Sequence, residues 1–195
     1  APAPRIHNSL SFEPLPSISY FIPHVFESQF FKIKTGKNTF VIFGNLYRPN
    51  TAPLADIKRS IQILNEIFMN IKSDPNLKHA QDIIIAGDTN IDLLKHENHL
   101  DTNMYLDSLL SNGLLPLITL PTRISGHSAT LLDHICTNII DDTFDTGIII
   151  SDLSDHFPVF YIRYLQTKPK KPEPIKINKI DDSSKDAFTS LLNSY

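Results

Sequence analysis

Side chains capable of acid–base and metal chemistry follow several predicted strands of this sequence. Hydrolysis of a phosphate ester needs a hard divalent cation held by carboxylate oxygens, and a group that orients and deprotonates water. A histidine that titrates near neutral pH can contact a phosphoryl oxygen, and a carboxylate partner fixes its tautomer. The chain supplies these residue types as Asp88, Asn90, Asp133, Asp155 and His156.

Each of these polar groups also has a structural interpretation when it is taken alone. Asp88 and Asn90 follow the apolar run "IIIAG", and aspartate and asparagine are common turn formers. Asp133 lies inside "TLLDHI", a strand-like segment where a carboxylate is costly unless it is paired. Asp155 and His156, in "SDHFPV", fit the cap of a strand equally well. Because all of them fall at ends of strands in one sheet-rich chain, the set as a whole favours phosphodiester chemistry.

Three other kinds of site fit the sequence less well. "DTNID" is similar to the start of an EF-hand loop, but Leu93 replaces the required glycine and His99 stands where the closing glutamate should be. "HENH" has two histidines but is not the H-E-x-x-H zinc motif, and it has no nearby third ligand, so we interpret it as a solvated loop. Cys136 lies close to a histidine, which leaves a catalytic Cys–His pair open beside the more common role of a small buried residue.

The pattern of apolar residues predicts a mixture of strands and helices. Residues 26–34 and 39–47 are rich in aromatic and β-branched side chains and flank "TGKN", so they predict a hairpin. "DIIIAG" predicts a buried strand, and "SATLLDHICTN", "TGIIIS" and "FPVFYIRYL" predict three more. A short helix is expected over 104–111, ending at Gly113. A longer helix is predicted by apolar residues at helical spacing, namely Ile57, Ile61, Leu64, Phe68 and Ile71.

Composition limits the classes of protein that the chain can represent. It has 195 residues, 41% of them hydrophobic, which is enough for one domain with a core. No apolar run is long enough for a membrane helix, and the first residues lack the features of a signal peptide, so we expect no membrane partner and no secretion. The net charge of -3 predicts that any DNA contact is a local patch. Residues 1–165 are expected to form the domain and residues 166–195, rich in proline and lysine, a linker and the start of a next region.

Four motifs in a fixed order carry a resemblance to a known family. "YRPN", "GDTN", "TLLDHI" and "SDH" resemble the endonuclease/exonuclease/phosphatase superfamily, which includes DNase-like nucleases, apurinic endonucleases and inositol-phosphate phosphatases. "PTRISGHSATLLDHICTN" is similar to the apurinic-type endonuclease domain of non-LTR, LINE-type retrotransposons, where a linker joins this domain to a reverse transcriptase. The resemblance implies a DNase-like α/β (α+β) fold, a two-sheet β-sandwich flanked by helices. It also implies nicking of DNA with Mg²⁺, or with Mn²⁺.

The resemblance implies a role for each residue of the motifs. Asp88 would be the base that orients water, and Asn90 its hydrogen-bonding neighbour. His156 would contact the scissile phosphate, with Asp133 holding its ring and Tyr47 close to the phosphate.

Metal and DNA contacts are implied in the same way. Asp155 would help Asp88 to position the magnesium ion. The residues expected to face DNA are Arg48, Asn50, Thr122, Arg123 and Thr130.

One departure from the family pattern affects the expected activity. In the family, two earlier strands carry an asparagine and a metal-binding glutamate, and nothing before Tyr47 matches them; Glu27 belongs to what is a later strand of the family domain. We therefore expect the chain to lack the N-terminal third of the fold and to be a weak nuclease or none. The alternatives are a phosphatase acting on a phosphorylated small molecule or lipid, and a non-catalytic DNA-binding remnant. A retroelement origin would imply a nuclear or cytoplasmic protein.

Overall fold

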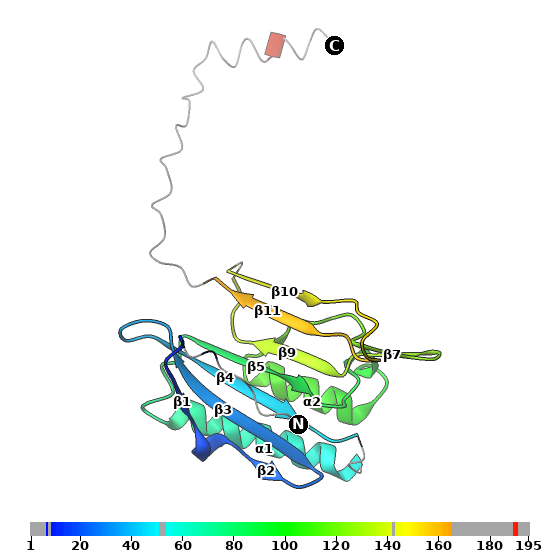
Figure 1. Cartoon of the computed structure of the whole chain (residues 1–195), viewed down its shortest axis with the longest axis horizontal. Coiled ribbons are helices and arrows are strands. Elements are labelled where there is room, and N and C mark those ends of the chain that lie inside the picture. The colour runs from blue at the N-terminus through cyan, green and yellow to red at the C-terminus, as the bar shows by residue number, and fades with distance from the viewer. Residues whose placement is uncertain (1–6, 8, 51–53, 142, 165–188, 191–195) are drawn as a thin grey trace. The chain divides into compact units, whose positions relative to one another are not determined.

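The computed structural model describes residues 7, 9–50, 54–141, 143–164 and 189–190. These residues form a mixed α/β arrangement of strands and two α-helices (Figure 1). In chain order the elements are β1 Phe12–Pro14, a 3-10 turn Pro16–Ile18, β2 Phe21–Ile22, β3 Phe26–Lys34, β4 Phe40–Tyr47, α1 Leu54–Ser73, β5 Asp82–Asp88, a 3-10 turn Leu93–Lys95, α2 Leu100–Ser111, β6 Leu115–Pro116, β7 Arg123–Ser125, β8 Ser128–Thr130, β9 Asp133–Thr137, β10 Phe144–Ile148 and β11 Val159–Arg163.

The larger sheet has seven strands, in the order β1-β3-β4-β5-β9-β6, with β2 added beside β3. The hairpin predicted from "TGKN" is the antiparallel pair β3–β4. Strand β5 runs parallel to β4, because α1 carries the chain back to the edge where β4 began. Strand β9 then pairs antiparallel with β5, which brings the ends of two polar motifs together.

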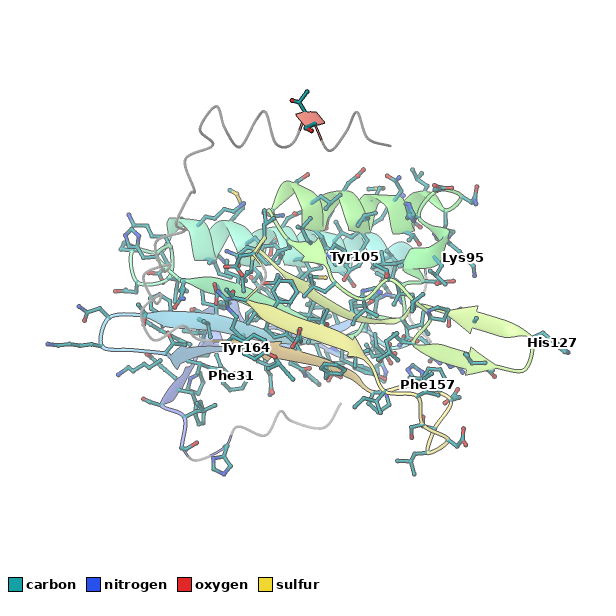
Figure 2. The ribbon with its side chains drawn as sticks, turned by 90° about the horizontal axis from the view of Figure 1, so that it is seen from above. Phe31, Lys95, Tyr105, His127, Phe157 and Tyr164 are labelled. Carbon is teal, nitrogen blue, oxygen red and sulfur yellow. The ribbon has the colours of Figure 1, made fainter. Side chains whose placement is uncertain are left out.

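The long helix α1 buries the apolar stripe that the sequence predicts. All five residues of that stripe are buried, and Ile63 and Ile67 widen it. Helices α1 and α2 lie together on one side of the large sheet (Figure 2). The core is therefore formed between helix side chains and apolar strand residues such as Ile42 and Ile85, and it gives the sheet a rigid support.

A second sheet contains the antiparallel strands β10 and β11, which lie over β9 (Figure 1). Ile148, Val159 and Tyr161 of these strands pack against the common core. The expected α/β class with two packed sheets and flanking helices is thus present. The second sheet has only two strands in the described part of the chain. The predicted lack of the N-terminal third stays a prediction.

Helix α2 is longer than the sequence pattern indicates. It begins at Leu100 rather than at residue 104, because the ring of His99 accepts a hydrogen bond from the backbone N–H of Thr102 and caps the first turn. Its other end matches the prediction. Gly113 has φ +79°, and Leu114 N–H donates to Leu109 O at 2.9 Å, a Schellman ending.

Strands β7 and β8 form a separate two-stranded hairpin. Its tip, at His127, projects away from the rest of the domain (Figure 2). The segment "SATLLDHICTN", predicted as one strand, is therefore two, β8 in the hairpin and β9 in the large sheet.

The chain divides into two units, residues 1–165 and 166–195. Only residues 189–190 of the second unit are described, so the predicted linker lies outside the described residues and the domain division stays a prediction. Neither helix in the described segments combines the length and the apolar character that a membrane crossing requires.

Candidate active site

Four residues lie in one row across the large sheet. Glu27 of β3 pairs with Tyr47 of β4, Tyr47 with Asp88 of β5, and Asp88 with Asp133 of β9. Directly paired residues of neighbouring strands point to the same face of a sheet. The row therefore shares one face and ends in two adjacent carboxylates.

His156 reaches this row from the segment before β11. Its Nδ1 lies 2.9 Å from Oδ2 of Asp133, the contact that the resemblance implied. One ligand atom from each of Asp88, Asp133 and His156 lies within 4.8 Å of the others. All three residues are half-buried, so the group is held by the fold and still open to a substrate.

The turn after β5 requires a particular backbone. Gly87 has φ +152°, and a Cβ there would lie 1.8 Å from the carbonyl oxygen of Leu46, so only glycine fits. Asn90 has φ +49°, a conformation that asparagine tolerates better than most residues. Its N–H donates to Oδ1 of Asp88 at 3.0 Å, and its side-chain N–H donates to Arg48 O at 2.8 Å. The Asp88 carboxylate and the Asn90 amide are thereby held in a fixed relation.

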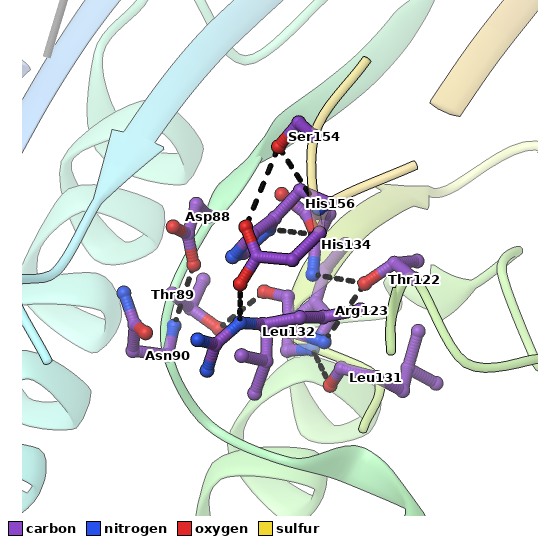
Figure 3. Close-up of polar contacts among 12 residues, drawn as sticks. Asp88, Thr89, Asn90, Thr122, Arg123, Leu131, Leu132, His134, Ser154 and His156 are labelled. Carbon is purple, nitrogen blue, oxygen red and sulfur yellow. Dashed lines mark hydrogen bonds and ion pairs between the residues drawn. The ribbon is translucent and has the colours of Figure 1, made fainter. Parts of the chain in front are cut away.

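Thr122 links β9 to the segment that carries His156. Its hydroxyl oxygen accepts hydrogen bonds from the N–H groups of Leu132, at 3.1 Å, and Asp133, at 3.0 Å (Figure 3). Its carbonyl oxygen accepts a hydrogen bond from Phe157 N–H at 2.6 Å. Thr122 is fully buried, and its hydroxyl holds the backbone of the site, so any contact of this residue with DNA stays a prediction.

The electrostatics of Asp88 suit a general base. Burial raises the pKa of its carboxyl group, and the nearby charge of Asp133 raises it further. The hydrogen bond from Asn90 lowers this pKa, but its effect is smaller. A raised pKa makes the carboxylate a stronger proton acceptor. The proximity of two carboxylates also creates a place where a cation would be stabilised.

Asp155 is paired with an arginine. Arg123 Nε–H donates to its Oδ2 at 2.8 Å, and this hydrogen bond holds the pKa of Asp155 below its usual value. The backbone is tied as well, because Ile124 N–H donates to Asp155 O at 3.0 Å. Within the part of the chain that is described, the structure does not bring Asp155 into the group that could hold a metal ion.

Comparisons with solved structures give the fold a precedent. The endonuclease domain of TRAS1, a telomere-specific non-LTR retrotransposon, matches with a TM-score of 0.56 and 18% identity, over 80% of this chain and 68% of that one. The 3′ phosphatase NExo from Neisseria, solved with a product DNA hairpin, matches with a TM-score of 0.51 and 16% identity, over 82% and 71%. An endonuclease/exonuclease/phosphatase family protein from Bacteroides thetaiotaomicron matches with a TM-score of 0.41 and 21% identity, over 70% and 52%.

The chain shares its fold with the endonuclease domain of TRAS1 and with NExo. At these identities the likeness establishes the fold alone. No protein-family model matches the sequence, and no curated protein matches it.

Within this fold, the donor set fits a hard divalent cation. Asp88 and Asp133 offer carboxylate oxygens, which Mg²⁺ and Mn²⁺ prefer. The ring of His156 is engaged through Nδ1 with Asp133, so this residue is better placed for a phosphoryl oxygen than for the metal. Glu27 lies in the same row two strands from Asp88, where the sequence analysis had expected no matching glutamate.

The predicted DNA-facing residues differ in exposure. Arg48 is only 4% exposed and donates from Nη1 to Asn90 O at 3.3 Å, so it supports the turn from within, and its contact with DNA stays a prediction. Asn50 is exposed. Arg123 and Thr130 pair across the base of the β7–β8 hairpin, and both are half-buried. DNA contact by these last three stays a prediction.

The alternative sites are not formed. Cys136 is fully buried, and burial raises the pKa of its thiol to about 12, so it is not a nucleophile near neutral pH. Leu93 begins a 3-10 turn, in which the Asp92 side chain accepts a hydrogen bond from Leu94 N–H, rather than an EF-hand loop. In "HENH", His99 caps α2.

Sequence reasoning missed three buried residues beside the site, Thr89, Tyr105 and His134. Thr89 lies between Asp88 and Asn90 in the chain, and His134 follows Asp133. Successive side chains of a strand point to opposite faces, so the chain neighbours of Asp88 and Asp133 are expected on the buried face beneath the site. This position in the sequence could have indicated Thr89 and His134.

Proposed function

We propose that this chain is the magnesium-dependent endonuclease part of a retrotransposon polyprotein and that it nicks DNA by phosphodiester hydrolysis. The observation that carries the proposal is the group of Asp88, Asp133 and His156 at the adjoining ends of β5 and β9. The likeness to the endonuclease domain of TRAS1 supports the retrotransposon setting. A reverse transcriptase region in the same polyprotein is the partner that this setting implies.

The proposed reaction assigns a task to each residue. Asp88 takes a proton from water as the water oxygen bonds to phosphorus, and Asn90 keeps the carboxylate aligned. Asp133 accepts a hydrogen bond from Nδ1–H of His156, so Nε2 faces the phosphoryl group and donates to it when the ring carries both hydrogens. The bond from phosphorus to the departing strand breaks, and the leaving oxygen takes up a proton from solvent.

The divalent cation supplies positive charge against the charge that develops on the phosphoryl oxygens. Asp88 and Asp133 are the residues that would hold it. Tyr47 lies in the row beside Asp88, where it would contact the phosphate from the other side.

The test is nicking of supercoiled plasmid by the purified chain with Mg²⁺, compared with the same reaction in chelator. Asp88→Asn should lower the rate by about 10²–10⁴-fold, the usual cost of removing an acid–base group. Asp107→Asn is the matched control, because Asp107 is exposed on α2. Equal loss in both variants, or nicking that persists in chelator, would contradict the proposal.

A phosphatase is the second candidate, because the similar structure of NExo is described as a 3′ phosphatase bound to a DNA hairpin. Three substrates separate the candidates: supercoiled plasmid, a DNA hairpin with a 3′ phosphate, and inositol phosphates. Release of phosphate from the hairpin or the inositol phosphates without plasmid nicking would favour the phosphatase.

A DNA-binding remnant is the non-enzymatic rival. It predicts retention of plasmid or hairpin at every magnesium concentration, with no cleavage product. Measuring binding by gel shift and cleavage by product analysis over one Mg²⁺ titration distinguishes it from an enzyme.

A further inference from the structure

A buried hydrogen-bond network lies next to the two carboxylates, on the helix side of the sheet. Thr89, Tyr105 and His134 are 3%, 1% and 3% exposed. The Nδ1 atom of His134 lies 3.1 Å from the hydroxyl of Thr89 and 3.1 Å from the hydroxyl of Tyr105. Figure 3 shows Thr89 and His134 beside the active-site group, and Figure 2 labels Tyr105, which comes from α2.

The partner of its other nitrogen determines the protonation of the His134 ring. Nε2 lies 3.1 Å from the carbonyl oxygen of Leu131, and a carbonyl can only accept. Nε2 therefore carries the hydrogen and donates it. With that hydrogen on Nε2, Nδ1 is the acceptor that the two hydroxyls face in the neutral ring.

The two hydroxyls have different choices of acceptor. Nδ1 has one lone pair. The Thr89 hydroxyl also lies 3.4 Å from the carbonyl oxygen of Leu132, and the Tyr105 hydroxyl is within hydrogen-bond reach of both His134 Nδ1 and the Thr89 hydroxyl. The simplest assignment is that Thr89 donates to Nδ1, the shorter of its two contacts, and that Tyr105 donates to the hydroxyl oxygen of Thr89. One continuous network then connects α2, β9 and the turn after β5.

This network acts on Thr89, which lies in the chain between the proposed base Asp88 and Asn90. Thr89 N–H donates to Leu132 O at 3.0 Å, which extends the β5–β9 pairing by one residue past Asp88. Asn90, next in the chain, has a positive φ of 49° that most residues avoid. Backbones of this kind persist where the surroundings hold them. Thr89 is therefore the point from which both Asp88 and Asn90 are oriented.

We propose that Thr89, His134 and Tyr105 are positioning residues, which fix Asp88 and Asn90 relative to Asp133 from beneath the sheet. The inference rests on the proposed function, because it assigns these buried groups to the same reaction. None of them contacts the open face of the site, so they act through the residues that do.

Thr89→Val tests the hydroxyl with the least change of shape. The single-turnover rate of plasmid nicking should fall by about 10²-fold, since a displacement of about 1 Å can cost that much, while DNA affinity stays unchanged. Thr89→Ser keeps the hydroxyl and should restore the rate. Tyr105→Phe should behave like Thr89→Val, whereas Tyr161→Phe, which removes a hydroxyl from β11, should leave the rate unchanged. Wild-type rates in both Thr89→Val and Tyr105→Phe would overturn the proposal.

Amide hydrogen exchange gives a readout that needs no activity. In Thr89→Val and Tyr105→Phe, protection should be lost at the amides of residues 89 and 90 while that of Ile85, within β5, is kept. If the wild-type chain does not nick DNA but this local loss is found, the proposed function fails and the positioning role stands. If exchange at residues 89 and 90 is unchanged, or changes only together with Ile85, the network is not a positioning device.

Discussion

The substitution Asp133→Asn tests the link between the geometry of the site and its chemistry. Asparagine keeps the size of the side chain but removes the charge that faces Nδ1 of His156 at 2.9 Å. Two unit charges about 4 Å apart interact by about 4 kcal/mol at an effective dielectric constant of about 20. The side chains of His156 and Asp133 are 30% and 18% exposed, so we take about half of this value, about 2 kcal/mol, as the interaction with His156 that is lost in the transition state.

That loss corresponds to about 30-fold in rate, because each 1.4 kcal/mol is about tenfold. The asparagine amide also no longer fixes the ring tautomer, which adds to the effect. We therefore expect the single-turnover nicking rate to fall by about 10²-fold or more, within the range of about 10²–10⁴-fold for acid–base groups. Thermal unfolding should show a folded variant.

The pH dependence gives an independent readout of the same substitution. The charge of Asp133 is one cause of the raised pKa of Asp88, and burial is the larger one. Asp133→Asn removes the effect of the charge but leaves the effect of burial, so the pKa of Asp88 should fall but stay above its usual value. A base works above its pKa, so the acid limb of the pH–rate profile at saturating Mg²⁺ should move to lower pH. An unchanged rate, or a limb that moves to higher pH, would refute this reasoning.

Three further predictions concern stability and DNA binding. The raised pKa of Asp88 means that its ionisation opposes folding, so Asp88→Asn should raise the melting temperature at pH 7 without metal; a lower value would contradict this. The pKa of His134 is lowered to about 4 from 6.5, so the unfolded chain takes up the proton first, and about 3 kcal/mol of stability should be lost as pH falls from 6.5 to 4 in urea unfolding. His134→Asn should flatten that curve, and an equal slope would exclude His134 as its cause. Arg123→Ala should weaken DNA binding and reduce the slope of log affinity against log salt concentration by about 0.9. Asp155→Asn releases the Arg123 guanidinium and should strengthen DNA binding. If both substitutions changed the affinity in the same direction, this pair of residues would not belong to the DNA interface.

The sequence was enough to locate most elements of the fold. The apolar stripe of α1 and the hairpin β3–β4 follow from local sequence patterns, and the stripe of α1 is buried as predicted. The ending of α2 at Gly113 follows from local backbone preference. These features depend on interactions between residues close in the chain, which is why a single sequence contains them.

The sequence also named the residues that meet at the site. Asp88, Asp133 and His156 were proposed from their position at ends of strands, and the antiparallel pairing of β5 with β9 brings the first two side by side. Their proximity depends on strand order and register. Both are set by long-range packing, so the sequence indicated the residue types but not the row they form.

Only the tertiary structure decided which polar side chains are buried. Arginine and threonine are residue types usually found at the surface, yet both Arg48 and Thr122 are buried. Arg48 supports the turn at Asn90, and Thr122 holds the backbone of β9. The network around His134 was likewise hidden, because its members come from α2, β9 and the turn after β5. A polar group can be buried when partners satisfy it, and those partners are brought to it from distant parts of the chain only when the elements pack.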